Sequence, residues 1–176
     1  QRAIPTTEVF LQDCFVADDR RIGGEGDGFR GLMGTFDRSR ITLAAGEVGL
    51  GRACVEYAVA YARERETFGR KIHEHQAVSF RLVDAHLKVE QARHLVHHAA
   101  RLADAGERVT REAAMAKLAA SEAAMYAAWA AVQTLGGYGY SREYPVEKWF
   151  RDAKLEEIWE GTSDIMRLVI SRELFR

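Results

Sequence analysis

The sequence has 176 residues, of which 47% are hydrophobic, and its formal net charge is −1, with acidic and basic residues mixed along the chain. This length fits one domain, or one domain plus part of another, and the hydrophobic share is enough for a sizeable core. The sequence has no basic stripe of the kind that binds nucleic acid and no apolar stretch long enough to span a bilayer. We therefore expect neither nucleic-acid binding nor a membrane span.

The two cysteines, Cys14 and Cys54, lie in different segments and do not have the spacing of metal ligands. We therefore expect two reduced thiols, in the cytoplasm of a bacterial-type cell or in the mitochondrial matrix. The N-terminus lacks the charged-then-apolar pattern of a signal peptide. Because the sequence does not begin with Met, we expect it to start inside a longer protein or to have been trimmed.

The first predicted element is a strand over residues 8–16, whose composition is typical of β-structure. A single strand leaves its backbone groups unpaired, so we expect it to be the end of a sheet whose other strands lie outside the sequence. Further on, Gly26–Gly31 matches the G-x-G-x-x-G pattern of dinucleotide-binding folds. Such a fold needs a second parallel strand after the helix, and here another helix follows. We therefore interpret these glycines as a turn into a helix.

Helical periodicity dominates the rest of the sequence, because small and apolar residues recur in steps of three and four. Five helices are predicted, over about residues 28–66, 76–105, 111–135, 144–154 and 162–175. Gly106 and Gly136 end the second and third of them, as glycine does at helix C-termini. Long helices with short connections indicate antiparallel neighbours. The predicted fold is therefore mainly α, an antiparallel four-helix up-down bundle preceded by one strand.

A short segment, Trp159-Glu160-Gly161-Thr162-Ser163, precedes the last predicted helix. Thr162 or Ser163 can cap that helix, because a hydroxyl oxygen accepts hydrogen bonds from the free N–H groups of its first turn. Glu160 then lies on a turn loosened by Gly161 and next to a large indole. A carboxylate in that setting is a candidate general base. A solvated loop acid before a capped helix is the commoner situation for such residues.

Other catalytic motifs give no second candidate. His94, His97 and His98 have helical spacing, but neither an H-E-x-x-H motif nor a cluster of cysteines supports a zinc site. The histidines are therefore interpreted as surface residues, and no metal is expected. The sequence contains no G-x-S-x-G nucleophile elbow and no phosphate-binding P-loop.

Three further segments contain groups that fit a cofactor or a polar site. Residues 65–69 combine a cation, a hydroxyl and an aromatic ring at a helix end, where they fit a phosphate and a planar ring. An ordinary basic helix terminus is the alternative. Residues 133–140 form a glycine-rich break that a nucleotide can approach closely, or else only a helix cap and a turn. The charges of residues 37–40, inside the first helix, form either a solvated face or the lining of a polar site between helices.

Together these segments resemble the C-terminal part of an acyl-CoA dehydrogenase. The resemblance covers nearly the whole sequence, and the ordered set of motifs is more specific than any one of them. In the family's order the motifs are Phe36-Asp37-Arg38-Ser39-Arg40, Arg65-Glu66-Thr67-Phe68-Gly69, His75-Gln76, Gln133-Thr134-Leu135-Gly136-Gly137, Tyr144-Pro145-Val146-Glu147-Lys148, Arg151-Asp152-Ala153-Lys154 and Glu160-Gly161-Thr162-Ser163. The resemblance favours a functional role for Glu160.

The resemblance implies a domain organisation. Members of the family have an N-terminal helical domain, a middle β domain and a C-terminal four-helix bundle. The sequence resembles the end of the β domain and its connecting loop over residues 1–27, followed by the C-terminal bundle over residues 28–176. The N-terminal helices and most of the β domain, with their flavin and acyl contacts, lie outside it.

The resemblance also implies a reaction, the FAD-dependent α,β-dehydrogenation of an acyl-CoA thioester. Glu160 resembles the base that removes the α-proton while a hydride leaves Cβ for FAD N5. A thioester α-proton is too weakly acidic for a carboxylate unless preorganised donors stabilise the developing enolate oxygen. In the family these donors are the backbone N–H of the base and a ribityl hydroxyl of FAD. Some relatives carry the base on the helix that contains Arg40, but that site is basic here, which favours Glu160.

The other site residues are carried over by position. Residues that resemble FAD contacts, some of which reach the flavin of a neighbouring subunit in the family, are Arg65, Thr67, Phe68, Gln76, Gln133, Gly136 and Gly137. Thr162 and Asp164 resemble FAD contacts on the base's own side, although Asp164 stands where a glutamine is common. Asp37, Arg40 and Gly161 resemble substrate contacts.

The resemblance implies partners as well. We expect an acyl-CoA substrate, an electron-transfer flavoprotein as electron acceptor, and assembly into a homodimer or homotetramer. One alternative is an acyl-CoA oxidase-like enzyme that passes its electrons to oxygen. Another is a non-catalytic helical bundle that serves as an oligomerisation module.

Overall fold

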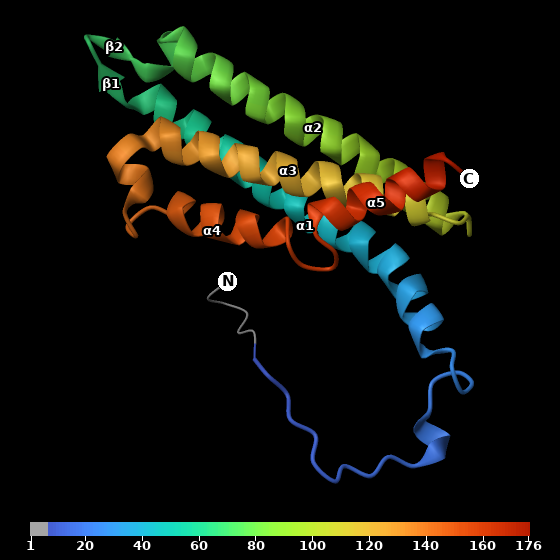
Figure 1. Ribbon diagram of the computed structural model, residues 1–176. Helices are drawn as coiled ribbons and strands as arrows, with labels where there is room; N and C mark the ends of the chain where they lie inside the picture. Colours follow the sequence, from blue (N-terminus) through green and yellow to red (C-terminus); the bar gives the residue numbers. More distant parts are fainter. Residues whose placement is uncertain (1–6) are drawn as a thin grey trace.

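A computed structural model describes residues 7–176 (Figure 1). The elements are η1 (Asp18–Arg20), α1 (Gly28–Glu64), β1 (Glu66–Thr67), β2 (Arg70–Lys71), η2 (Ile72–Glu74), α2 (Gln76–Asp104), α3 (Thr110–Leu135), η3 (Gly136–Tyr140), α4 (Val146–Glu156) and α5 (Ser163–Leu174). The five predicted helices are confirmed, and so is the mainly α fold. The glycine-rich segment before α1 forms a turn, in which the Asp27 N–H donates to the carbonyl of Gly24.

Helix α3 lies at the centre of the bundle and contacts α1, α2, α4 and α5. The sequence predicts a single buried stripe on this helix, but α3 is buried on nearly all sides. Small side chains allow this, because they let four neighbouring helices approach closely. The buried alanines are Ala113, Ala114, Ala116, Ala120, Ala123, Ala124, Ala127, Ala128, Ala130 and Ala131.

The tightest approach in the core involves Gly51 of α1. A Cβ atom at this position would lie 2.9 Å from Cγ2 of Val89 on α2 and 3.4 Å from Cα of Ala124 on α3. Only a glycine lets these three helices pack at this spacing. The stripe of small residues predicted on α1 therefore serves close helix packing inside the chain.

The fourth position of the bundle is filled by two helices. Helices α4 and α5 follow one another along α3 (Figure 1), and residues 157–162 separate them. Glu160 and Gly161 have φ angles of +50° and +107°, which no α-helix accommodates. The Oγ1 atom of Thr162 then accepts a hydrogen bond of 3.3 Å from the N–H of Ile165, so Thr162 caps α5. The break places Glu160 part-way along the bundle.

A small hairpin closes the connection between α1 and α2. Strands β1 and β2 pair antiparallel, with Glu66 opposite Lys71 and Thr67 opposite Arg70. Phe68 and Gly69 form the two-residue turn, both with positive φ, as this type of hairpin requires. The hairpin and η3 lie at the same end of the bundle (Figure 1).

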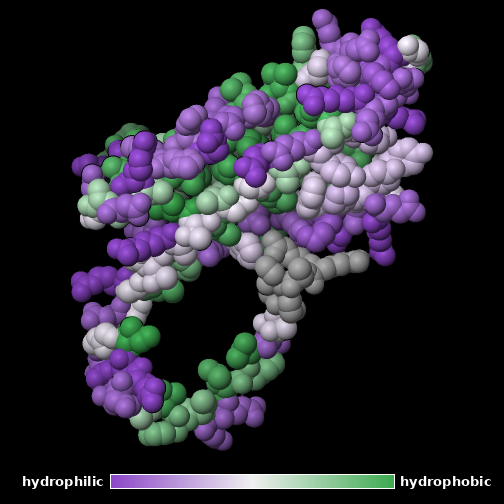
Figure 2. Space-filling model, turned by 180° about the vertical axis from the view of Figure 1, so that it is seen from behind, coloured by the Kyte–Doolittle hydropathy of each residue, from purple (hydrophilic) through white to green (hydrophobic). Residues whose placement is uncertain are grey.

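The strand predicted over residues 8–16 is not formed within this chain, and since its partner strands are expected outside the sequence, it stays a prediction. These residues have no regular secondary structure and are exposed. A strand is held by hydrogen bonds to a neighbouring strand, and residues 8–16 pair with none in the described part of the chain. Figure 2 shows hydrophobic side chains gathered on this extended segment, where Phe10 and Phe15 are exposed. Within residues 7–176, no helix is both long and apolar enough to cross a membrane.

Candidate active site

The Glu160 side chain is half-buried in the break between α4 and α5, and it faces the first third of α1. The Ser39 hydroxyl donates a hydrogen bond of 2.7 Å to Oε2 of Glu160. The neighbouring residue, Arg40, donates from Nε to the backbone carbonyl of Glu160 over 3.1 Å. Two consecutive residues of α1 therefore fix both the carboxylate and the main chain of Glu160.

Arg40 is only 7% exposed, so the charged residues of this part of α1 line a polar site between helices, one of the two alternatives raised by the sequence. Burial lowers the pKa of the Arg40 guanidinium, and the charges of Asp37 and Glu160 oppose that shift. Asp37 lies 3.9 Å from Nη1 of Arg40 and accepts a hydrogen bond from the hydroxyl of Thr110, at the start of α3. Asp37 thereby ties α1 to α3 next to the turn.

A lysine from α3 completes the enclosure of the turn. Lys117 is fully buried, and its Nζ atom donates hydrogen bonds of 2.6 Å to the carbonyl of Glu156 and 3.0 Å to the carbonyl of Gly161. These carbonyls lie at the two ends of the break between α4 and α5. One ammonium group therefore bridges both sides of the turn that carries Glu160.

Two buried carboxyl groups face this ammonium. Burial raises the pKa of Glu47 to about 9, while the charge of Lys117 opposes that shift. Burial also raises the pKa of Glu156, whose Oε2 accepts a hydrogen bond of 2.7 Å from the indole N–H of Trp159. In Lys117 the pKa is lowered by burial, against the charges of Glu47 and Glu156. Near neutral pH this places a neutral Glu47 beside the lysine.

Gly161 is constrained by the space around it as well as by its backbone angles. A Cβ atom at this position would lie 2.6 Å from the Cε atom of the fully buried Met166 and 3.5 Å from Nη2 of Arg40. The structure thus brings the predicted catalytic and substrate residues together at one place: Glu160, Gly161, Arg40 and Asp37. Thr162, a predicted cofactor contact, follows directly at the start of α5.

A second group of predicted residues lies at the hairpin end of the bundle. A cavity of about 630 Å³ there is lined by residues from α1, the hairpin and η3. Its lining includes four of the predicted FAD contacts: Arg65, Thr67, Gly136 and Gly137. The Arg65 guanidinium lies over the ring of Tyr138, 5.8 Å from its centre. This end of the bundle therefore combines a cation, a hydroxyl and open glycine backbone.

Other predicted cofactor residues lie on open surface. The side chain of Phe68 is 97% exposed at the hairpin tip, and Gln76 and Gln133 are exposed at the start of α2 and in the last turn of α3. The Asp164 side chain points to solvent, where it lies 3.7 Å from Arg167. None of these four side chains lines the cavity at the hairpin end.

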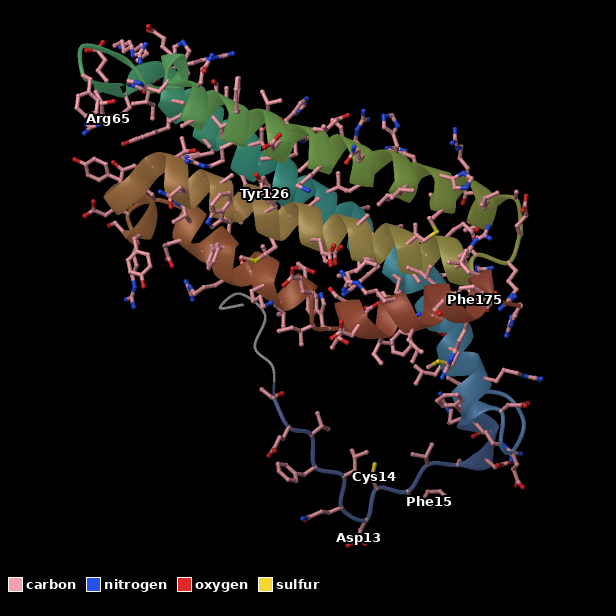
Figure 3. The ribbon with its side chains drawn as sticks, turned by 45° about the horizontal axis from the view of Figure 1, so that its top comes forward. Asp13, Cys14, Phe15, Arg65, Tyr126 and Phe175 are labelled. Carbon is pink, nitrogen blue, oxygen red and sulfur yellow. The ribbon has the colours of Figure 1, made fainter. Side chains whose placement is uncertain are left out.

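The two groups of predicted site residues are far apart. Ser39 and Arg65 are separated by most of the 37-residue helix α1, or roughly 40 Å at 1.5 Å per residue. Figure 3 places Arg65 at the hairpin end and Phe175 at the opposite end of the bundle. One small molecule cannot contact both Glu160 and Arg65 of the same chain at this separation.

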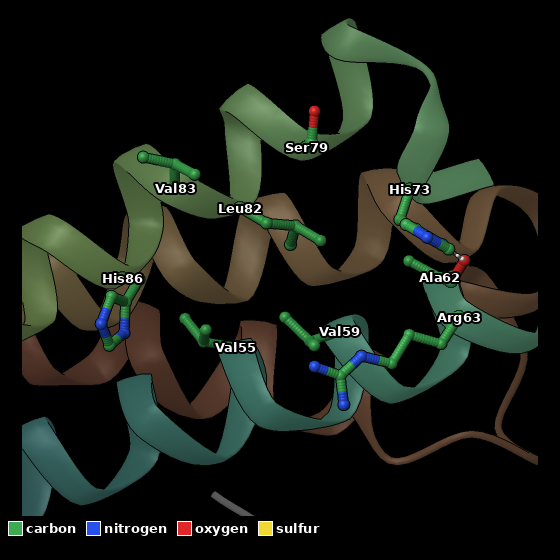
Figure 4. A pocket seen from close by; sticks show the side chains of 9 residues that line it. All are labelled: Val55, Val59, Ala62, Arg63, His73, Ser79, Leu82, Val83 and His86. Carbon is green, nitrogen blue, oxygen red and sulfur yellow. Dashed lines mark hydrogen bonds between the residues drawn. The ribbon is translucent and has the colours of Figure 1, made fainter. Parts of the chain in front are cut away.

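An apolar pocket lies elsewhere. It has a volume of about 380 Å³ and lies between α1 and α2, with Val55 and Val59 on one side and Leu82 on the other (Figure 4). At one end His73 is hydrogen-bonded through Nδ1 to the carbonyl of Ala62, 3.1 Å away. The pocket contains no residue predicted for catalysis or cofactor binding.

Sequence reasoning missed three residues that hold the turn: Ser39, Lys117 and Glu47. Ser39 was part of a recognised motif but received no role. Lys117 is the only lysine of α3 and stands among alanines, and Glu47 follows the buried Ala44 by three residues. The alanine-rich composition around Lys117 is a signal that could have found it, because such a helix is buried on several sides, although Glu122 stands among alanines in the same helix and is exposed.

Comparison with known proteins gives a consistent match. Residues 26–175 match the family model described as "Acyl-CoA dehydrogenase, C-terminal domain". The chain is 47% identical over 169 residues to an acyl-CoA dehydrogenase of Bacillus subtilis, covering 96% of this chain. The structure of butyryl-CoA dehydrogenase from Megasphaera elsdenii superposes with a TM-score of 0.92 at 42% identity, covering 94% of this chain and 43% of that one.

A further structure comes from work titled "Electron transferring flavoprotein of Acidaminococcus fermentans: Towards a mechanism of flavin-based electron bifurcation". It matches with a TM-score of 0.93 and 45% identity over 94% of this chain and 44% of that one. The chain spans 45% of the length of its B. subtilis relative. These matches therefore concern the C-terminal half of the relatives.

Proposed function

The chain belongs to the acyl-CoA dehydrogenase family, and on this premise we propose that the complete protein is a flavin-dependent acyl-CoA dehydrogenase whose general base is Glu160. The observation that carries the proposal is the position of the Glu160 carboxylate. It lies in a break between α4 and α5, with Ser39 Oγ 2.7 Å from Oε2. A loop acid without a role does not need this support, whereas a base must be held within reach of the carbon it deprotonates.

In the proposed mechanism Glu160 removes the α-proton of the acyl thioester. Ser39 and Arg40 restrict the side chain and the main chain of Glu160, so that less motion has to be frozen out when substrate binds. The backbone hydrogen bonds of the turn are donated by Ile158, Trp159 and Ser163. Within residues 7–176 no backbone hydrogen bond is donated by the N–H of Glu160, so this group can donate to the thioester oxygen as negative charge develops there.

The left-handed φ of Glu160 supports the proposal. A non-glycine residue with a φ of +50° costs roughly 1–2 kcal/mol, and such strain persists where the surroundings hold it in place. Here the surroundings are the bonds from Arg40 to the carbonyl of Glu160 and from Lys117 to the carbonyl of Gly161. The strained backbone lowers the stability of the turn but fixes the direction of the carboxylate, as strained residues at functional sites do.

The residues at the hairpin end fit a flavin dinucleotide. Arg65 and Thr67 offer charged and hydroxyl donors to a phosphate, and Gly136 has a positive φ and no atom within 4 Å of where a Cβ would stand. A ligand can therefore reach the backbone closely there. When bound, FAD would supply the acceptor for the hydride that leaves Cβ. The chain's own contribution is the base and these donors.

The separation of the two groups supports a shared site. Because Arg65 lies roughly 40 Å from the Glu160 turn along α1, we propose that the hairpin end of one subunit completes the flavin site of another. This requires at least a homodimer. For the electrons we propose an electron-transfer flavoprotein, since a structural relative comes from work on such a protein. Turnover measured with this acceptor and with oxygen distinguishes a dehydrogenase from an oxidase-like enzyme.

The decisive experiment is Glu160→Gln in the complete protein. Glutamine has nearly the same size but cannot accept the α-proton at neutral pH. We expect FAD and acyl-CoA to remain bound, and the bleaching of the flavin after anaerobic mixing with acyl-CoA to slow by about 10²–10⁴-fold. Stopped-flow absorbance measures the rate.

The matched control is Glu157→Gln, which removes a nearby acid of the same segment. The Glu157 carboxylate forms an ion pair with Lys154, 2.6 Å away, whose side chain is 62% exposed. We expect the wild-type rate for this variant. If Glu160→Gln also bleaches at the wild-type rate, Glu160 is not the base, and Asp37 becomes the next carboxylate to test.

A further inference from the structure

A buried lysine connects the turn that carries Glu160 to the core of the bundle. Lys117 of α3 is fully buried, and it donates to the carbonyls of Glu156 and Gly161 at the two ends of the turn. These carbonyls have no helical partner, because α4 ends at Glu156 and α5 begins at Ser163. The lysine therefore satisfies acceptors that exist only because the fourth helix is broken.

A carboxyl group from a third helix also lies near the lysine, although neither of its oxygens has a hydrogen-bond partner among the described residues. Glu47 of α1 is 1% exposed and its carboxyl group faces Lys117, while Glu156 of α4 faces the same ammonium. Burying an ammonium is costly unless it is surrounded by acceptors. Here two carbonyls and two carboxyl groups from α1, α4 and the turn surround it. A purely structural core would be built more easily from apolar residues, so the buried charge calls for a specific explanation.

We propose that Lys117 is a positioning residue for Glu160: by bonding the carbonyls on both sides of the break, it sets the turn that aims the carboxylate at the substrate. Lys117 does not touch substrate or cofactor in this role. Its ammonium fixes the main chain on each side of Glu160, while Ser39 and Arg40 fix the residue itself. This inference rests on the proposed function of Glu160 as the base.

The direct test measures proton removal apart from hydride transfer. An acyl-CoA with a quaternary β-carbon has α-hydrogens but no β-hydride to give, so its exchange with heavy water reports the base alone. In the complete, FAD-loaded protein we expect Lys117→Met to slow deuterium incorporation at Cα by about 10- to 100-fold, the size expected for a displaced catalytic group. FAD content and the affinity for this acyl-CoA should stay unchanged.

Stopped-flow bleaching with an ordinary acyl-CoA separates positioning from loss of folded protein. A positioning role lowers the rate constant at full amplitude, whereas partial unfolding lowers the amplitude and leaves the surviving sites at the wild-type rate. The second result would overturn the proposal. The control is Lys154→Met, which removes an exposed lysine paired with Glu157, and it should leave both quantities unchanged.

A second variant guards against misfolding of Lys117→Met. Lys117→Met combined with Glu47→Leu replaces both buried ionisable groups by apolar ones, so that neither is left buried without the opposite charge, an exchange that proteins often tolerate. The carbonyls of Glu156 and Gly161 lose their donor in this variant, as they do in Lys117→Met. We expect this double variant to fold and to exchange as slowly as Lys117→Met. Wild-type exchange, or failure of both variants to fold, would overturn the positioning role. Wild-type exchange in Glu160→Gln, measured in parallel, would instead refute the proposed base.

Discussion

The turn at Glu160 and the hairpin end at Arg65 belong to one bundle but are built in opposite ways. The turn is enclosed by α1, α3, α4 and α5, and its carbonyls and carboxylate are held by Ser39, Arg40 and Lys117. The hairpin end is open, with a fully exposed Phe68 at its tip and a cavity that faces solvent. Both regions contain positive φ angles. At the turn these residues are partly buried, whereas the tip of the hairpin, where His75 contacts Phe68 and Thr67, is exposed.

This difference shows which part of the proposed site the chain organises by itself. At the turn the base is in position before any ligand arrives, because side chains from α1 and α3 hold it. At the hairpin end the donors lie on the wall of a cavity that is open to solvent. A ligand there needs a second surface, which in the proposed assembly comes from another subunit. Variants of the turn should therefore affect proton removal, and variants of the hairpin end should affect FAD binding.

Arg65→Ala should have the largest effect on FAD binding. A guanidinium on a phosphate makes charge-assisted hydrogen bonds worth about 1.5–3 kcal/mol, so FAD affinity should fall roughly 10- to 100-fold. Proton removal at saturating FAD should change little, because Arg65 is assigned to a phosphate of FAD and not to the carbon that Glu160 deprotonates. FAD retention after gel filtration and titration of the apoprotein measure the affinity. The control is Arg63→Ala, two residues earlier in the sequence. Full FAD retention in Arg65→Ala together with a large loss of turnover would contradict the assignment of Arg65 to FAD binding.

Two glycine variants compare the regions directly. Gly161→Ala places a Cβ at a φ of +107° and within 2.6 Å of Met166 Cε, and Gly69→Ala places one at a φ of +77° in open space. Each costs roughly 1–2 kcal/mol through its backbone, and Gly161→Ala adds a steric clash. Gly161→Ala should slow α-proton exchange by about tenfold with normal FAD retention. Gly69→Ala should weaken FAD retention and leave α-proton exchange normal. If the two variants show the same phenotype, the turn and the hairpin end do not have separate roles.

Glu47 should make the stability of the protein depend on pH. Its pKa is raised from 4.5 to about 9 in the folded state, with Lys117, Glu156 and Glu160 as the charged groups that face it. Between these two values the folded state binds a proton that the unfolded state has lost. The free energy of unfolding should therefore fall as pH rises, by at most about 1.4 kcal/mol per pH unit. Urea unfolding between about pH 5.5 and pH 8.5 measures the slope.

Glu47→Gln is the variant that isolates this effect, because it keeps the size of the side chain and removes its titration. The variant should lose part of the slope and should match the wild type most closely at low pH, where Glu47 is protonated in both states. Equal slopes for the two proteins would show that Glu47 is ionised in the folded protein at neutral pH.

The contrast between the enclosed turn and the open hairpin end also explains which structural features can be predicted from the sequence. Periodicity locates the helices, because burial of α1 and α2 follows one stripe, from Ile41 to Ala62 and from Leu82 to Ala99. Periodicity does not predict the burial of α3, because this helix is surrounded by four others. It also does not predict that Lys117 and Glu47 are buried, because lysine and glutamate within a helix are normally solvated. Their roles depend on a break in the opposite helix that no local pattern on α1 or α3 encodes.

The strand predicted over residues 8–16 cannot be judged from the chain alone. Its composition favours β-structure, but strand formation depends on a partner, and local composition does not supply one. At the candidate site, Glu160 and Thr162 could be found from the sequence, because an acid, a glycine and a helix-capping residue follow one another directly. The 2.7 Å bond from Ser39 to Glu160 joins residues far apart in the sequence and follows only from the fold.

The smallest effect concerns the cap of α5 and separates two adjacent hydroxyl residues that the sequence leaves equivalent. The Oγ1 atom of Thr162 accepts from the N–H of Ile165, whereas the buried Oγ atom of Ser163 has no hydrogen-bond partner among the described residues. Thr162→Ala should lower the free energy of unfolding by about 1 kcal/mol, and Thr162→Ser should restore most of it. Ser163→Ala should be neutral or slightly stabilising, because it removes an unsatisfied buried oxygen. Urea midpoints at constant pH measure these differences. Equal losses for Thr162→Ala and Ser163→Ala would mean that both hydroxyls cap the helix, and that the start of α5 is less fixed than the turn before it.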